Sequence, residues 1–183
     1  GTWMNLREGE PQDFDESRLA LGSEQRSEPL VHTPFSEQNG EVSPDGRWLA
    51  YQSNDSGRAE IWVRQFADVN GGRWQVSSGG GFQPLWSRAG KDVELFYRDL
   101  SGALIRVAVE RGPGWATGTP TELFGAGQYF FGAGEAFGRT YDISPDGRRF
   151  LMIKDVALDQ SSAPTILVVQ NWTEELKRLV PAR

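Results

Sequence analysis

Apolar and polar positions alternate along this chain in short segments, and clusters of glycine, proline, asparagine, aspartate and serine separate the segments. The clearest group consists of Arg47–Gln52, Glu60–Arg64 and Arg73–Ser77, each bounded by a turn signal. Short apolar or alternating segments bounded by turns are typical of strands, and this group has no helical periodicity. The pattern therefore predicts an all-β fold.

Two further groups of strand-like segments follow in the same order. The second group comprises Phe82–Trp86, Val93–Arg98, Ala103–Val109 and Glu122–Phe124. The third comprises Arg139–Ile143, Arg149–Lys154 and Thr165–Val169. After it, Asn171–Arg178 has the pattern of a capped helical turn, with Thr173 as the cap. The repetition predicts consecutive antiparallel sheets, of which the last ends early.

A five-residue motif recurs in the first and third groups. Ser43–Arg47 reads Ser-Pro-Asp-Gly-Arg, and Ser144–Arg148 has the same five residues. A degenerate copy, Ser87–Lys91, begins 44 residues after the first, a spacing that fits one four-stranded propeller blade. Serine, proline and glycine stand where a type I turn prefers them, so the motif predicts a tight hairpin between two antiparallel strands.

The first 28 residues are predicted to form a unit of their own. Thr2–Leu6 and Pro29–Thr33 have strand patterns without evident partners. Between them, Arg7–Glu28 carries seven acidic residues and three arginines and is interpreted as an acidic, flexible loop. A regulatory or partner-binding tail is the alternative. The predicted division is residues 1–28, a partial blade strand with the loop, and residues 29–183, a single domain of propeller blades.

Five segments spread over most of the chain match the blade pattern of a known family. They are Phe35–Tyr51, Glu60–Gln65, Arg73–Ser77, Pro84–Ser87 and Val169–Leu176. Together they resemble the C-terminal part of TolB-like β-propellers, whose repeats are WD40-like (PD40). Such propellers are often attached to bacterial serine/threonine kinases and transcriptional regulators. The middle repeat departs from the family because its turn has lost proline and aspartate.

The resemblance implies a partial β-propeller of about three four-stranded antiparallel blades, plus incomplete strands of terminal blades. It also implies a bacterial protein and favours a periplasmic or cell-envelope location over the cytoplasm. About half of a six- or seven-bladed ring is present, and an isolated half would expose unpaired strand edges. We therefore expect either a longer natural chain or a homodimer in which two copies complete one ring.

Charge and composition narrow the possible partners. With 19 Lys and Arg against 25 Asp and Glu, the net charge is -6, which argues against nucleic acid and anionic membranes. The absence of cysteine excludes disulfides, thiolate zinc sites and cysteine nucleophiles. No apolar run of about 18 residues is present, so no membrane span is expected.

The remaining polar residues form no recognised catalytic pattern. His32, the only histidine, has no Gly-x-Ser-x-Gly elbow to act with and is interpreted as structural. Gly132–Gly138 differs in spacing from a dinucleotide-binding loop. Four aspartates are weighed as a calcium site or an acid/base pair and are interpreted as turn or surface residues: Asp99, Asp142, Asp146 and Asp155. We predict no catalytic residue, no metal ligand and no cofactor.

Aromatic residues in two predicted loops are the candidate binding site. The rim comprises Trp115, Tyr129, Phe130, Phe131 and Phe137, and packing within the core or loops is the alternative. We predict a non-catalytic module for protein interaction or ligand sensing, whose loops, including Gly125–Gly138, dock a protein or a small ligand. The alternative function is a hydrolase or lyase with an acidic, metal-assisted centre in the propeller channel.

Overall fold

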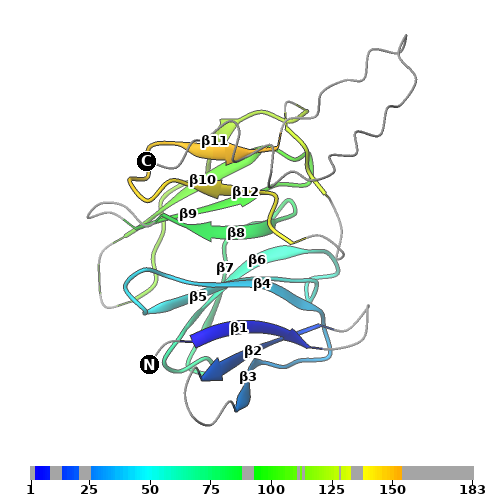
Figure 1. Ribbon diagram of the computed structural model, residues 1–183, viewed down its shortest axis with the longest axis vertical. Coiled ribbons are helices and arrows are strands. Elements are labelled where there is room, and N and C mark those ends of the chain that lie inside the picture. Colours follow the sequence, from blue (N-terminus) through cyan, green and yellow to red (C-terminus); the bar gives the residue numbers. More distant parts are fainter. Residues whose placement is uncertain are drawn as a thin grey trace, which may run out of the picture.

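The computed structural model describes residues 3–8, 14–20, 26–87, 93–110, 112, 114–127, 129–132 and 138–153. All the helices and strands assigned in this part of the chain are β-strands (Figure 1). They are β1 (Trp3–Glu8), β2 (Asp15–Ala20), β3 (Ser27–Val31), β4 (Glu37–Val42), β5 (Trp48–Ser53), β6 (Glu60–Gln65), β7 (Arg73–Gln75), β8 (Phe82–Trp86), β9 (Val93–Arg98), β10 (Leu104–Val109), β11 (Thr121–Phe124), β12 (Tyr141–Ile143) and β13 (Phe150–Met152). The prediction of an all-β fold is confirmed.

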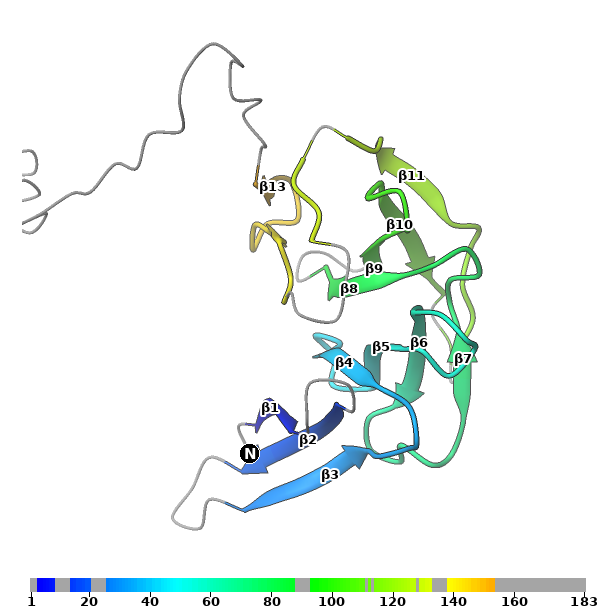
Figure 2. The ribbon, with the colours of Figure 1, turned by 90° about the vertical axis from the view of Figure 1, so that its right-hand side faces the viewer.

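The strands form consecutive antiparallel sheets in which chain order equals spatial order. Strands β4 to β7 make one four-stranded sheet, and β8 to β11 make the next. A three-stranded sheet, β1-β2-β3, precedes them, and the pair β12-β13 follows. Figure 2 shows the sheets fanning around a common side, with β4 and β8 innermost and β7 and β11 outermost. This arrangement is a partial β-propeller that is not closed, as the repeats predict.

The Ser-Pro-Asp-Gly turns have the same geometry in both copies. The amide of Gly46 donates to the carbonyl oxygen of Ser43, and Gly147 donates to Ser144, each at 2.8 Å. Both glycines have positive φ, 72° and 68°, which a side chain would strain. The serine hydroxyl of each copy donates to the aspartate of its own turn at 2.5 Å. The motif therefore joins inner strand to second strand, as predicted.

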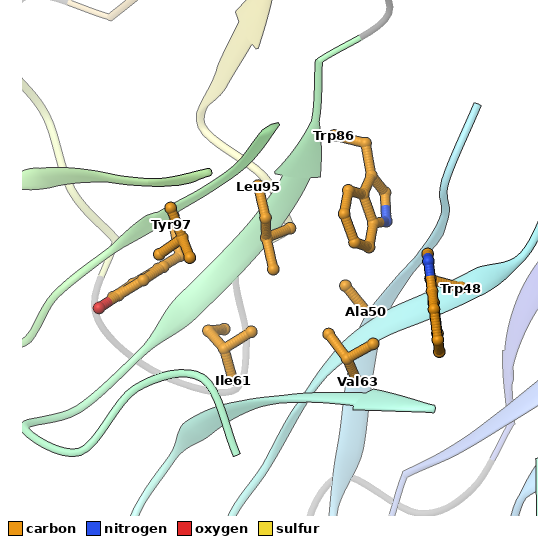
Figure 3. Packing of buried hydrophobic residues seen from close by; sticks show 8 residues of the cluster. Trp48, Ala50, Ile61, Val63, Trp86, Leu95 and Tyr97 are labelled. Carbon is orange, nitrogen blue, oxygen red and sulfur yellow. The ribbon is translucent and has the colours of Figure 1, made fainter. Parts of the chain in front are cut away.

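Alternating residues of β5 fill the two spaces on either side of their blade. Trp48 and Ala50 pack with Trp86 and Leu95 of the following blade (Figure 3). Leu49, between them in sequence, packs instead toward the three-stranded sheet that precedes the blade. A fully buried leucine contributes about 1.5–3 kcal/mol, so these contacts between neighbouring blades stabilise the fold.

The N-terminal segment differs from the sequence-based expectation. Residues 7–28 were expected to form a loop, but Asp15–Ala20 is strand β2 and pairs with both β1 and β3. The expectation is wrong over this strand because its buried residues include Glu16 and Ser17, which no hydrophobic pattern reveals. Glu16 is buried because its carboxylate accepts the amide of Gly40 at 2.5 Å.

The other strands agree with prediction to within a few residues. The third repeat is shorter than predicted, since β12 and β13 span three residues each. Thr165–Val169 and the helical turn Asn171–Arg178 lie outside the described residues. The division of the chain at residue 28 stays a prediction.

Candidate binding site at the bulge end of the blades

The inner strands of the two complete blades share an irregularity near their first residues. In β4 and in β8 the antiparallel register shifts at a bulge. The bulged residues, Asn39 and Gln83, have φ values of 57° and 56°, which are uncommon for residues other than glycine. We call this end of the blades the bulge end, and the opposite end, where the Ser-Pro-Asp-Gly turns lie, the turn end.

Side-chain hydrogen bonds connect the blades at the bulge end. Gln52 Oε1 accepts from Asn39 Nδ2 at 3.3 Å and from the amide of Gln83, in the next blade, at 3.4 Å. Gln83 Oε1 in turn accepts from the amide and the hydroxyl of Thr140, at 3.1 and 3.0 Å. The Tyr141 hydroxyl donates to the carbonyl oxygen of Gln83 at 2.8 Å. Each blade is therefore connected to the next through the side chain of a glutamine, Gln52 in the first blade and Gln83 in the second.

This network leaves several buried atoms without a partner. Six buried side-chain nitrogen and oxygen atoms in the described part of the chain have no hydrogen bond, and one of them is Trp62 Nε1. The other five belong to the bulge end: Glu37 Oε2, Gln38 Oε1, Gln83 Nε2, Arg98 Nε and Arg98 Nη1. Buried polar groups are nearly always paired in native proteins, so these five atoms mark the bulge end as the candidate binding site.

Arg98 is the most unusual member of this cluster. It ends β9 with only 1% of its surface exposed, and its guanidinium lies 5.2 Å from the ring centroid of Phe131. Burial lowers the pKa of this guanidinium from its ordinary value, while Tyr141 and Asp99 act in the opposite direction. Burial likewise raises the pKa of Tyr141. The site thus combines a desolvated cation with a neutral phenol.

Sequence reasoning did not single out Arg98. The residue ends a predicted strand and looks like an ordinary polar terminus. A signal was nevertheless present, because alignment of the repeats places an arginine where the first blade has Gln52. Only the structure shows that this position is buried.

An acidic group borders the site on the side of the three-stranded sheet. Glu37 Oε1 accepts from the hydroxyls of Thr33 and Ser53, at 2.6 and 3.2 Å. Burial is the largest cause of a raised pKa for Glu37, and the charge of Asp15 adds to it. His32 is exposed, and its Nδ1 lies 2.7 Å from Asp15 Oδ2.

The predicted rim residues divide between the two ends of the blades. Trp115 lies in the connection from β10 to β11, at the turn end, with its ring centroid 5.1 Å from that of Trp48. Tyr129, Phe130 and Phe131 lie in the connection from β11 to β12, at the bulge end. Phe137 falls outside the described residues. The structure therefore brings three rim residues together and places Trp115 apart from them.

The weighed aspartates that the structure describes accept hydrogen bonds from nearby backbone amides, Asp99 in a turn and Asp142 in strand β12. Asp99 Oδ1 accepts from the amides of Ser101 and Ala103, each at 2.9 Å. Asp142 accepts the amide of Ile143, and Asp155 lies outside the described residues. The described ranges contain no group of three or more histidine or acidic residues that could hold a metal ion. They also contain no helix long and apolar enough to cross a membrane.

A shallow groove lies beside the bulge end. Its volume is about 250 Å³, and Gly80, Tyr97, Asp99 and Glu122 are among its lining residues. Burial raises the pKa of Tyr97 to about 12, and the charges of Glu60 and Asp99 contribute. The groove holds no unpaired buried side-chain atom of the kind found around Arg98.

Comparison with known proteins gives matches of structure only. No family model matches the chain, and no curated protein matches it. A protein assigned as TolB from Agrobacterium tumefaciens matches 68% of this chain and 47% of its own, with 21% identity and a TM-score of 0.48. TolB from Acinetobacter baumannii matches 80% of this chain and 45% of its own, with 16% identity and a TM-score of 0.38.

The chain resembles TolB propellers. It spans about half the length of the two TolB structures that it matches. At these identities the TolB likeness concerns the fold alone, and no conclusion about activity rests on it.

Proposed function

We propose that this chain is a non-catalytic β-propeller interaction module that binds a small ligand or a protein partner at the bulge end of its blades. The observation that supports the proposal is that Glu37, Gln38, Gln83 and Arg98, all at the bulge end, carry five buried side-chain atoms without a hydrogen bond. Each such atom costs about 1–3 kcal/mol in the unbound protein. A ligand that supplies hydrogen-bond partners would recover part of that cost.

The unpaired atoms suit a polar ligand because they include both kinds of hydrogen-bonding group. Glu37 Oε2 and Gln38 Oε1 are acceptors, whereas Gln83 Nε2 and the Arg98 nitrogens are donors. They also lie on rigid strands of neighbouring blades rather than on loops. Few, fixed polar groups of this kind confer specificity in binding sites.

The aromatic rim that we propose for this site comprises Tyr129, Phe130 and Phe131. All three lie in the connection from β11 to β12, and Phe130 exposes 36% of its surface. Their rings supply apolar contact beside the unpaired polar atoms, a common combination in recognition sites.

The motif resemblance also leads us to propose a periplasmic or cell-envelope location. Fractionation of cells that express the full natural gene tests this location.

A screen of small molecules and short peptides by thermal unfolding tests the site. The seven tryptophans give the fluorescence signal. The informative variant is Gln38→Leu, which removes the unpaired Oε1 together with the hydrogen bond from Nε2 to Ser36 Oγ and keeps the size of the side chain. We expect ligands that raise the Tm of the wild type to lose at least half of that effect in this variant.

The matched control is Gln75→Leu, the same substitution in the outer strand β7, where Gln75 is exposed. This variant should keep the whole ligand effect. Ligands whose effect is the same in wild type and Gln38→Leu bind elsewhere, and a screen with only such ligands would refute the proposal.

A further inference from the structure

Arg98 and Gln52 occupy equivalent positions in consecutive blades. Gln52 pairs with Gln38 in the register of β4 and β5, and Arg98 pairs with Phe82 in the register of β8 and β9. Both residues lie beside the bulge of their blade. The same position therefore holds an amide in the first blade and a guanidinium in the second.

The exchange removes a structural contact and leaves a cation in its place. Gln52 accepts the amide of Gln83 from the next blade, but an arginine has no acceptor with which to do the same. In the second blade, the hydrogen bond to the following blade is made by Gln83 Oε1, which accepts the amide of Thr140. Arg98 therefore does not make the hydrogen bond to the next blade that Gln52 makes from the equivalent position.

No carboxylate in the described part of the chain forms an ion pair with Arg98, although the charge of Asp99 opposes the lowering of the guanidinium pKa by burial. The neighbouring carboxylate, Asp99, directs Oδ1 to the amides of its own turn. A buried charge without a partner is strongly unfavourable, and an isolated guanidinium keeps its charge at every physiological pH. Gln83 Nε2, from the residue next to the register partner of Arg98, is a further unpaired donor.

The ring of Phe131 lies against Arg98 and against Phe82, the register partner of Arg98. Its centroid lies 5.5 Å from that of Phe82 and 5.2 Å from the Arg98 guanidinium. It also packs on Gly102, where an added Cβ would lie 3.0 Å from the ring. Because Phe131 belongs to a connection and not to a strand, its displacement breaks no sheet hydrogen bond.

We propose that Arg98 and Gln83 Nε2 receive a carboxylate group of the ligand, which enters between the second and third blades by displacing the ring of Phe131. The inference rests on the proposed function and specifies its ligand chemistry. A carboxylate is planar, accepts from two N–H groups at once, and matches the guanidinium fork. Binding turns a buried lone cation into a buried, hydrogen-bonded ion pair.

The test compares sodium acetate with sodium chloride at equal ionic strength and pH 7, with Tm as the readout. We expect acetate to raise the Tm of the wild type by roughly 3–6 °C once its concentration is about ten times the Kd. The informative variant is Arg98→Gln, which copies the first blade and is therefore compatible with the fold. It should lose the difference between acetate and chloride.

The matched control is Arg149→Gln, which removes the same charge from an arginine whose side chain is 80% exposed. It should respond to acetate as the wild type does. A second variant, Phe131→Ala, uncovers Arg98 without altering it and should lower the apparent Kd for acetate several-fold. It keeps the test decisive if Arg98→Gln fails to fold.

Two further probes define the source and the class of the anion. The rise in Tm caused by acetylated trialanine with a free carboxyl terminus is compared with that caused by its amide. A larger rise with the free acid than with acetate identifies the carboxyl terminus of a peptide as the ligand. An effect of acetate alone identifies a small carboxylate, and both results support the proposal. Inorganic phosphate acting where acetate does not would overturn it.

Equal effects of acetate on wild type and Arg98→Gln would also overturn the inference. The proposed function would survive that result if other ligands still depend on Gln38, and it would fall separately if none do.

Discussion

Glu37 at the start of β4 is subject to two opposing influences. Hydrogen bonds from Thr33 and Ser53 favour its carboxylate, whereas burial and the charge of Asp15 favour the neutral acid. Burial is the larger effect, so the pKa of Glu37 is raised above its ordinary value of 4.5. A carboxyl group whose pKa rises on folding stabilises the protein when protonated. That stability is lost as the pH rises from 4.5 through the raised pKa.

Replacing Glu37 by glutamine should therefore stabilise the protein at neutral pH. The amide keeps Oε1 as an acceptor and removes the buried charge, and we expect a gain of about 1 kcal/mol, or roughly 2–4 °C in Tm. Thermal unfolding from pH 4 to pH 8 measures it. The advantage of the variant should grow across the lower part of this range and disappear at acidic pH. A variant that is less stable than the wild type at pH 7 would contradict this account.

At the scale of the element, the Ser-Pro-Asp-Gly turn forms the same side-chain hydrogen bonds in both blades where it occurs. The aspartate of each copy accepts the serine hydroxyl and the amide of the following arginine. The hydrogen bond from Ser144 and that from the amide of Arg148 lower the pKa of Asp146 below its ordinary value of 3.8. The stabilisation is present above pH 3.8 and is lost as the pH falls through the lowered pKa.

Substituting Ser144→Ala should raise the pKa of Asp146 toward 3.8, because it removes the largest cause of the shift. An NMR titration of the aspartate side chains measures this directly. The control is Ser101→Ala, which removes the equivalent donor to Asp99 in another turn and should leave Asp146 unchanged. If the pKa of Asp146 were the same in Ser144→Ala and in the wild type, the serine hydroxyl would not stabilise the carboxylate.

At the scale of the whole molecule, the last described sheet presents an uncovered face. Leu151 in β13 stands at the position that Ala50 and Phe96 occupy in the two preceding blades. Those two residues are 0% and 2% exposed because the next blade covers them, whereas Leu151 is 73% exposed. A further blade packed on this face would cover it.

We expect this chain to form a homodimer that places a blade of the second copy against Leu151. Light scattering coupled to size exclusion, over a range of concentrations, should give twice the mass of one chain. The variant Leu151→Glu should give a monomer, because it puts a charge at the centre of the contact. Leu100→Glu, at a leucine that is 62% exposed in the turn after β9, is the control and should remain dimeric. A monomeric wild type at every concentration would rule out completion of the ring by a second copy.

Repeats and alternation in the sequence determined the blades, because strand pairing within a blade is local and turn residues mark its ends. The continuous apolar run Trp48–Tyr51 indicates a strand that is buried on both faces, because it is short and bounded by turn residues. The strand Asp15–Ala20 escaped this reasoning because hydrogen bonds, and not hydrophobicity, account for the burial of Glu16. The tertiary structure alone decided that Trp115 lies apart from Phe131, and that Arg98 is buried without a partner. Those features depend on which residues of different blades face each other, and the pattern along one strand does not contain that information.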